Sequence, residues 1–288
     1  MANISAADVK SLREKTGAGM MDCKNALVET DGDFAKAEKI LKEKGLAAVE
    51  KRSGRATNEG KIFIKIKENG SSGSAAALVE MVSETDFVAR NPDFIALGGT
   101  IADLVLDKGY TEPNDELNGM VSDLASKIRE NMNLKRIKTV KADAGEYLTS
   151  YIHGEGAIGV VVKLGAEKAE VWSNEEAKAF AYTTALHVAA FNPTALDESK
   201  IDKAWLKEQE EIFAKQMELD EKLKGKPANV IENVLKGKVN KFLKDICLMD
   251  QAYVKDDKIT VKKAIEEAGK KFGAKISVLD FTYFKVGG

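Results

Sequence analysis

The feature that most constrains the fold is an order of elements that occurs twice along the chain. Residues 61–82 contain two strand-like runs, "KIFIKIK" and "AAALVEMV", separated by the turn signal "ENGSSGS", and a helical pattern of apolar residues follows over 94–106. The same order recurs in "EYLTSYI", "HGEG", "AIGVVVKL" and "EEAKAFAYTTALHVAAF". We therefore predict an α+β fold whose core is a pair of similar units, each with a small antiparallel sheet.

Helical patterns surround this core. Three short helices separated by "TGAGM" and "TDGD" are expected before residue 45, and a further helix is expected over 115–132. Two longer helices with "GKP" between them predict an antiparallel hairpin, and the run "ISVLDFTYFKV" is expected to complete the second sheet, which makes the hairpin an insertion. The predicted divisions are a helical domain at 1–45, a partly helical linker at 46–60, core subdomains at 61–145 and at 146–196 with 248–288, and the inserted hairpin at 197–247.

Charge and cysteine content exclude several classes of partner and site. The chain has 44 lysines and arginines against 46 aspartates and glutamates, so it has no basic surplus to attract nucleic acid or an anionic membrane. Cys23 and Cys247 lie far apart without metal-ligand spacing, and neither a signal peptide nor a membrane-length apolar run is found. These features predict a reduced, cytoplasmic protein that binds no nucleic acid directly and no membrane.

The motif most suggestive of an enzyme is the spacing of Gly154, Gly156 and Gly159, which fits a dinucleotide-binding loop. Such a loop must open a helix, whereas the β-branched run at 160–164 favours a strand, so we interpret the glycines as a hairpin turn. An NAD-dependent enzyme stays as an alternative that requires a helix there. We find no catalytic set and expect no cofactor and no metal site.

The two histidines give little material for catalysis. His187 lies on an apolar helical pattern and is expected to be a core or interface residue. His153 lies at a turn, where it either contacts a partner or hydrogen-bonds the hairpin backbone.

Apolar residues at the ends of elements are the remaining unexplained feature. Met20 and Met21 are placed in the glycine loop of the first helical domain, where they serve either as an adaptable contact surface or in packing within the bundle. In the tract "VEMVSETDFVARNPDF", Asp86 and Phe87 follow a predicted strand. Phe87 is either a contact residue in a connecting loop or a core aromatic that caps the hairpin. Taken alone, these residues indicate a binding protein with an unknown partner.

Two longer motifs resemble a known family. "LREKTGAGMMDCKNAL" at 12–27 and "EMVSETDFVAR" at 80–90 are similar to the two signature motifs of the elongation factor Ts family, the guanine-nucleotide exchange factors of elongation factor Tu. The resemblance covers nearly the whole chain. It implies an N-terminal three-helix ubiquitin-associated-like (UBA-like) domain, two α+β core subdomains and an inserted helical hairpin. It also implies a translation factor without covalent chemistry, which binds GDP-bound and nucleotide-free elongation factor Tu and releases GDP by disturbing the Mg²⁺ and phosphate site.

The resemblance also assigns residues to the partner. It implies that one tract reaches into the GTPase domain and displaces the surroundings of Mg²⁺, with Phe87 as an apolar wedge and Asp86 as a polar contact beside it: Thr85, Asp86, Phe87 and Val88. It implies that three residues of the N-terminal domain hold another helix of the same domain: Arg13, Met20 and Met21. His153 corresponds to a position that contacts a different domain of elongation factor Tu.

Two further expectations follow from the resemblance. Some bacterial members continue beyond the last core strand with a helical module, whereas this sequence stops at "FKVGG", so we expect its mechanism to depend more on the tract at 85–88 and on the N-terminal domain. In some members the inserted hairpin forms a dimer, so a homodimer through 197–247 is possible, although Glu208 and Lys215 interrupt a strict heptad. The alternative function is an adaptor that docks partners through the UBA-like domain without exchange activity.

Overall fold

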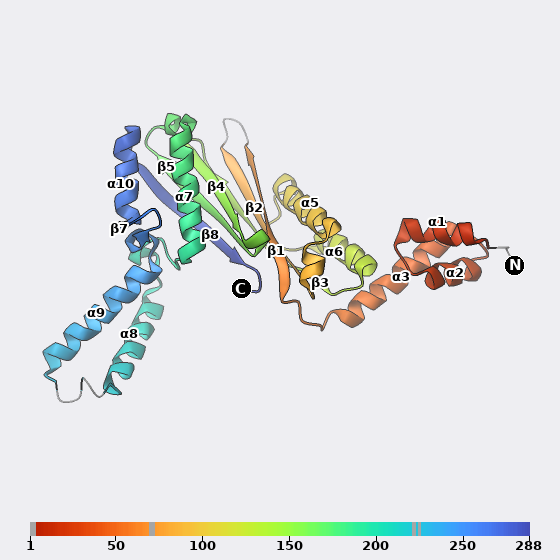
Figure 1. Ribbon diagram of the computed structural model, residues 1–288, viewed down its shortest axis with the longest axis horizontal. Helices are drawn as coiled ribbons and strands as arrows, with labels where there is room; N and C mark the ends of the chain where they lie inside the picture. The colour runs from red at the N-terminus through yellow and green to blue at the C-terminus, as the bar shows by residue number, and fades with distance from the viewer. Residues whose placement is uncertain (1–3, 69–72, 221–222, 224–225) are drawn as a thin grey trace.

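The computed structural model describes residues 4–68, 73–220, 223 and 226–288. Figure 1 shows an elongated molecule, with a group of three helices at the N-terminal end, two sheets in the middle and a helical hairpin that projects from the other end. The fold class is α+β, as predicted. The predicted turn at 68–74 and the glycine of "GKP" fall largely outside the described residues.

The N-terminal unit consists of the first three helices: α1 (Ala6–Thr16), α2 (Met20–Glu29) and α3 (Phe34–Arg52). A capping box begins α1, because the Ser5 hydroxyl accepts from the Asp8 N–H and the Asp8 carboxylate accepts from the Ser5 N–H. The unit has a small core that includes Leu12, Cys23 and Leu27. Helix α3 extends past the predicted domain boundary at residue 45, through the first part of the expected linker, and packs against α6 (Asp115–Ile128).

The first sheet has the antiparallel order β1-β2-β3: β1 (Glu59–Glu68), β2 (Ser74–Ser83) and β3 (Met132–Ala142). Two helices pack on one face of it: α5 (Pro92–Lys108) and α6 (Asp115–Ile128). The expectation of a helix to residue 132 is wrong at its end, because Arg129 caps α6 in the left-handed conformation and β3 begins three residues later. The strand β3 was not predicted.

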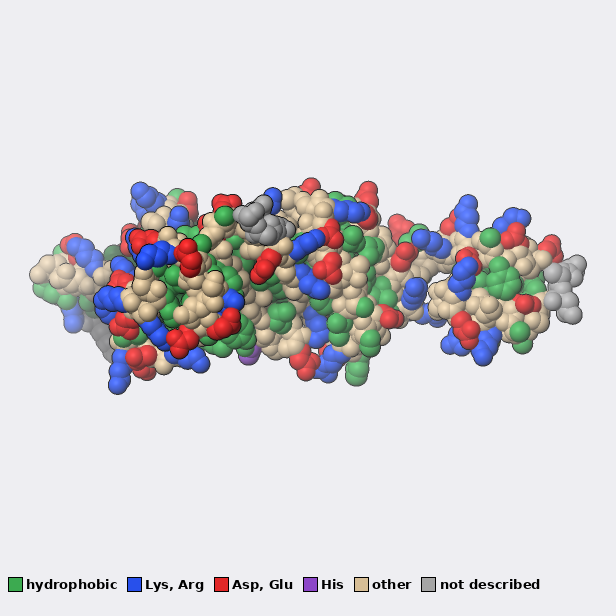
Figure 2. Space-filling view, turned by 90° about the horizontal axis from the view of Figure 1, so that it is seen from above, with side chains coloured by type: hydrophobic (Ala, Val, Ile, Leu, Met, Phe, Trp, Pro, Cys, Tyr) green, Lys and Arg blue, Asp and Glu red, His purple; other side chains and the backbone are tan. Residues whose placement is uncertain are grey.

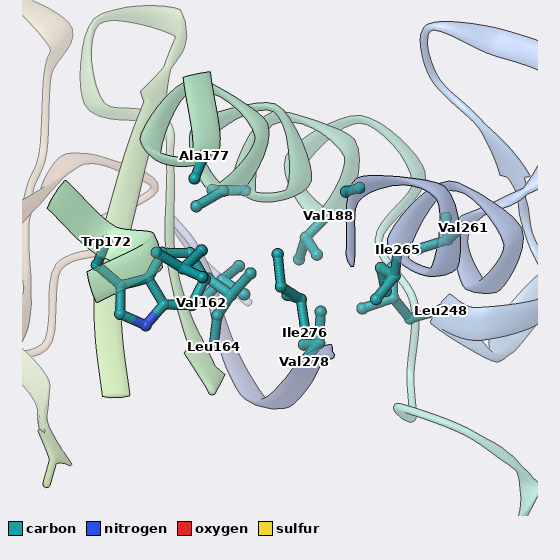
Figure 3. Packing of buried hydrophobic residues seen from close by; sticks show 14 of the residues in the cluster. Val162, Leu164, Trp172, Ala177, Val188, Leu248, Val261, Ile265, Ile276 and Val278 are labelled. Carbon is teal, nitrogen blue, oxygen red and sulfur yellow. The ribbon is translucent and has the colours of Figure 1, made fainter. Parts of the chain in front are cut away.

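The second sheet has the antiparallel order β4-β5-β8: β4 (Glu146–His153), β5 (Ile158–Ala166) and β8 (Ile276–Lys285). Helices α7 (Glu175–Phe191) and α10 (Val261–Phe272) pack on it over the largest core, shown in Figure 3. The pairing of β8 with β5 confirms that the last strand completes this sheet. Residues 160–164 lie within β5, so the alternative of a dinucleotide-binding helix is wrong. A small hairpin of β6 (Ala252–Tyr253) and β7 (Asp256–Thr260) was not predicted.

The two sheets meet through their other faces. Ile62, Leu78, Val161 and Phe284 are buried in the shared core between them. A Cβ on Gly159 would lie 2.4 Å from Ile62 Cγ2, so this glycine permits the close approach of the sheets. The third glycine of the supposed nucleotide motif therefore has a packing role.

The helical hairpin joins the second sheet between α7 and β6. It consists of α8 (Lys203–Glu218) and α9 (Ala228–Ile246). Buried Val239 and Leu243 pack with Leu206 and Phe213 between the helices. No helix in the described part of the chain is long and apolar enough to cross a membrane.

Candidate protein-interaction surface

The tract after β2 forms a short helix, α4 (Asp86–Ala89), rather than the expected loop. Thr85 is its N-cap, and the Thr85 hydroxyl accepts from the Val88 N–H at 3.4 Å. Phe87 is 80% exposed, whereas Val88 is 6% exposed and packs in the core between the first sheet and its two helices, α5 and α6. Phe87 therefore does not cap the core, and α4 presents an unpartnered aromatic ring at the end of a buried strand.

One ion pair joins the end of α4 to the turn between β4 and β5 of the second sheet. Arg90 lies 3.2 Å from the Asp86 carboxylate and 3.5 Å from the carboxylate of Glu155. Glu155 lies in the turn η2 (Gly154–Gly156), and its carbonyl accepts from Lys61 Nζ of β1. The "HGEG" turn and α4 therefore lie at the same edge of the core, although 60 or more residues separate them in sequence.

His153 precedes this turn and is exposed. Its Nδ1 lies 3.1 Å from the Tyr151 hydroxyl, and the Tyr151 ring packs edge-on against Tyr182 of α7. The hydrogen bond goes to a side chain, not to the hairpin backbone as one interpretation expected. His153 thus belongs to an exposed aromatic group beside the turn that contacts α4.

His187 is fully buried, as predicted for a core histidine. Its Nε2 lies 3.0 Å from Gln251 Oε1, and its Nδ1 accepts from the Val254 N–H at 3.2 Å. Burial lowers the pKa of His187 from the ordinary 6.5, with the hydrogen bond to Gln251 acting in the opposite direction. The residue holds α7 to the segment that follows the hairpin.

Three predicted contact residues lie on the N-terminal unit, away from α4. Arg13 is exposed near the end of α1, while Met20 and Met21, 44% and 65% exposed, begin α2 instead of lying in the glycine loop. Asp22 of α2 pairs with Arg129, the C-cap of α6, at 3.4 Å beside a groove of about 550 Å³. Figure 2 shows this unit as a separate lobe joined to the core by a narrow neck. The predicted contact residues therefore lie on two separate exposed surfaces, one around α4 and one on the N-terminal unit.

Glu130, which was not predicted as a site residue, holds α4 from outside the tract. The Glu130 carboxylate accepts from the Thr85 N–H at 3.1 Å and from the Thr85 hydroxyl at 2.8 Å. Glu130 lies between α6 and β3, and only the polar run "REN" between a helical and an alternating pattern could have drawn attention to it.

Phe87, Met20 and Met21 give these surfaces exposed apolar groups, and Asp86 and Arg90 give them charged ones. Among the described residues, no group of three or more His, Cys, Asp or Glu side chains could hold a metal ion. Burial raises the pKa of the Cys247 thiol to about 11, which keeps it protonated and unreactive at neutral pH. The exposed groups can bind a partner through apolar and charged contacts.

A comparison with known proteins decides the family. The model of the family described as Elongation factor TS matches residues 84–288, which is more than half of the chain. The chain belongs to the elongation factor Ts family. Elongation factor Ts of Treponema denticola is 49% identical over 286 residues, which is 99% of each chain. Elongation factor Ts of Treponema pallidum is 44% identical over 99% of each chain, and that of Clostridium acetobutylicum is 40% identical over 99% of this chain and 92% of its own. As a member of this family, the chain is a translation elongation factor.

Proposed function

We propose that this protein is the cytoplasmic guanine-nucleotide exchange factor of elongation factor Tu, which binds the GDP-bound form and releases GDP so that GTP can bind. The observation that carries the proposal is Phe87, which is 80% exposed in the tract that matches the family signature. An aromatic ring held at the end of a buried strand suits insertion into another protein.

The task of such a factor is thermodynamic. A GTPase holds its nucleotide through backbone amides, a lysine and a Mg²⁺ that neutralises phosphate oxygens. The exchange factor must bind the nucleotide-free state more tightly, and this preference is reciprocal with the loss of nucleotide affinity. A thousandfold loss corresponds to roughly 4 kcal/mol of differential binding, at about 1.4 kcal/mol per tenfold. No covalent step is required.

In the proposal, Phe87 supplies the largest part of the differential binding free energy between the nucleotide-free and GDP-bound partner. Transfer of a phenylalanine side chain from water into an apolar site contributes about 1.5–3 kcal/mol. Asp86 places a carboxylate, held by Arg90 at 3.2 Å, beside the inserted ring and disturbs the Mg²⁺ site. Thr85 caps α4 and Val88 anchors it in the core, so both residues fix the wedge.

The rest of the differential binding free energy requires further contacts with the partner. Arg13, Met20 and Met21 on the N-terminal UBA-like unit would hold a second element of the GTPase domain, because flexible methionine side chains adapt to an apolar surface. His153, exposed beside Tyr151, would contact another domain of the partner. Together these surfaces would orient the partner so that Phe87 meets its nucleotide site.

The direct experiment follows labelled GDP as it leaves elongation factor Tu in the presence of excess unlabelled GDP. The full chain should accelerate release in proportion to its concentration until the partner is saturated. Binding without acceleration would contradict exchange and would support the adaptor function.

The hairpin carries a separate proposal, a homodimer through residues 197–247. Ile212 and Ile231 are 39% and 38% exposed on α8 and α9, so each helix retains apolar surface after the two have packed together. Sedimentation of the full chain at several concentrations tests this proposal. Ile212→Glu combined with Ile231→Glu should shift the mass to that of a monomer, and a wild-type monomer at all concentrations would contradict it.

A further inference from the structure

Three segments that are distant in sequence meet where β2 ends. They are residues 53–55 after α3, residues 83–85 before α4, and residues 130–131 between α6 and β3. Asn131 lies at their centre and is 2% exposed. Its side-chain amide donates to the carbonyls of Ser53 at 3.2 Å and Arg55 at 2.7 Å, and its backbone N–H donates to the Glu84 carboxylate at 2.6 Å.

An ion pair closes this junction. The Arg55 guanidinium lies 3.4 Å from the same Glu84 carboxylate that Asn131 holds. The segment after α3 is thus bound both to Asn131 and to the residue before Thr85. Just upstream, Arg52 at the end of α3 donates to the Ala125 carbonyl of α6 at 3.3 Å. The direction in which the N-terminal unit leaves the core is therefore fixed beside the start of α4.

The neighbouring Glu130 fixes α4 itself. Its two carboxylate oxygens accept both the N–H and the hydroxyl of Thr85, and the Ser83 hydroxyl donates to the Thr85 carbonyl at 3.0 Å. A helix of four residues cannot hold its own conformation, because nucleation of a single turn is unfavourable. The orientation of Phe87 depends on these bonds to the N-cap and on the packing of Val88.

We propose that Asn131 and Glu130 are positioning residues for nucleotide exchange, which hold α4 and the N-terminal unit in a fixed mutual orientation so that both engage the partner together. This inference rests on the proposed exchange function. A fixed orientation removes the conformational entropy that α4 would otherwise lose when Phe87 enters the nucleotide site of the bound partner, so its loss lowers the maximal release rate more than the affinity. Both residues act through the placement of Phe87 relative to the N-terminal unit and need not touch the partner.

The test is a double-mutant cycle in the GDP-release assay. Asn131→Ala and Glu130→Ala should each lower the maximal release rate about tenfold, which equals about 1.4 kcal/mol, while the half-saturating concentration changes less than threefold. In the Phe87→Ala background, either substitution should add less than a twofold loss. A full tenfold loss in that background would overturn the inference, because the residues would then act independently of Phe87.

Two further variants separate positioning from folding. Glu130→Gln keeps an oxygen for the Thr85 N–H and an amide for its hydroxyl, so it should restore most of the activity that Glu130→Ala loses. It also keeps the proposal testable if Asn131→Ala does not fold. Asn118→Ala, at an exposed asparagine of α6, is the matched control and should behave as the wild type.

Amide hydrogen exchange of residues 86–89 in the free protein supplies a readout that does not depend on the partner. Asn131→Ala and Glu130→Ala should increase the exchange rates in α4, and Asn118→Ala should not. If the wild type fails to release GDP, the proposed function is wrong, while this readout still decides whether the two residues order α4. Unchanged rates in both alanine variants would overturn the inference.

Discussion

Phe87 and Val88 are neighbours in one helical turn, yet Phe87 is 80% exposed and Val88 is 6% exposed. Replacement by alanine should therefore change the free energy of unfolding at Val88 much more than at Phe87. Phe87→Ala should change the free energy of unfolding by less than about 0.5 kcal/mol, because the ring has little packing to lose. Val88→Ala should lower it by roughly 1.5 kcal/mol or more, since it removes buried carbon atoms and leaves a cavity. Urea denaturation of both variants checks the contrast, and an equal loss in the two would contradict it.

Adjacent glycines in α5 give a second matched pair. A Cβ on Gly98 would lie 2.2 Å from the ring of Phe63, whereas one on Gly99 would meet nothing within 4 Å. Gly98→Ala should destabilise the protein by about 1–3 kcal/mol through overpacking. Gly99→Ala should stabilise it by roughly 0.5–1 kcal/mol, because alanine favours a helix interior. Thermal unfolding of both variants provides the measurement, and a shift of the same sign in both would contradict the packing described.

A buried carboxylate in the first sheet forms a cross-strand ion pair and also binds the segment that follows β8 of the second sheet. Glu80 of β2 is fully buried and accepts from Arg136 Nε at 2.5 Å and from the Gly287 N–H at 2.9 Å. The Arg136 guanidinium also lies 4.1 Å from the centre of the Phe284 ring of β8. Arg136→Ala should lower the free energy of unfolding by about 3–5 kcal/mol, because it leaves a buried carboxylate without its cation.

A double variant tests whether the loss of stability comes from the unpaired Glu80 carboxylate. Arg136→Met with Glu80→Gln removes both charges and should recover part of the stability lost in Arg136→Met alone. Denaturant unfolding of the wild type, Arg136→Met, Glu80→Gln and the double variant gives the coupling energy. If the double variant is no more stable than Arg136→Met, the loss does not come from the unpaired charge.

The buried His187 predicts a dependence of stability on pH. Burial lowers its folded-state pKa below 6.5, so the unfolded chain binds more protons when the pH falls below that value. The contribution of neutral His187 to stability is present above pH 6.5 and is lost as the pH falls through its lower folded-state pKa. His187→Gln should flatten the fall in melting temperature below pH 6.5 relative to the wild type. An unchanged slope would show that His187 does not titrate on unfolding.

Local patterns predicted most of the fold because the strands and helices concerned bury apolar residues at regular spacing. β3 escaped detection because its register shifts opposite Glu80 and Met81, so Leu134 and Ile137 both face the core although their spacing breaks the alternation. The strand is also rich in lysine and arginine, which gives it the composition of a solvated surface.

The candidate site was predictable only in part. Phe87 stood out because an aromatic residue beside turn formers at a strand exit has no local partner, and its exposure bears this out. Glu130 and Asn131 could not be found in this way, because their bonds join segments 45 to 78 residues apart. The helix α4 could not be predicted from local sequence either, because its N-cap residue Thr85 is held by the Glu130 carboxylate from another part of the chain.

The central claim is that Phe87 drives GDP release from elongation factor Tu. The most direct test measures the maximal release rate of fluorescent GDP by stopped flow, with saturating wild-type protein or saturating Phe87→Ala. The burial of the ring, about 1.5–3 kcal/mol, predicts a rate roughly 10- to 100-fold lower for Phe87→Ala, with an unchanged melting temperature. Release by Phe87→Ala at the wild-type rate would contradict the account.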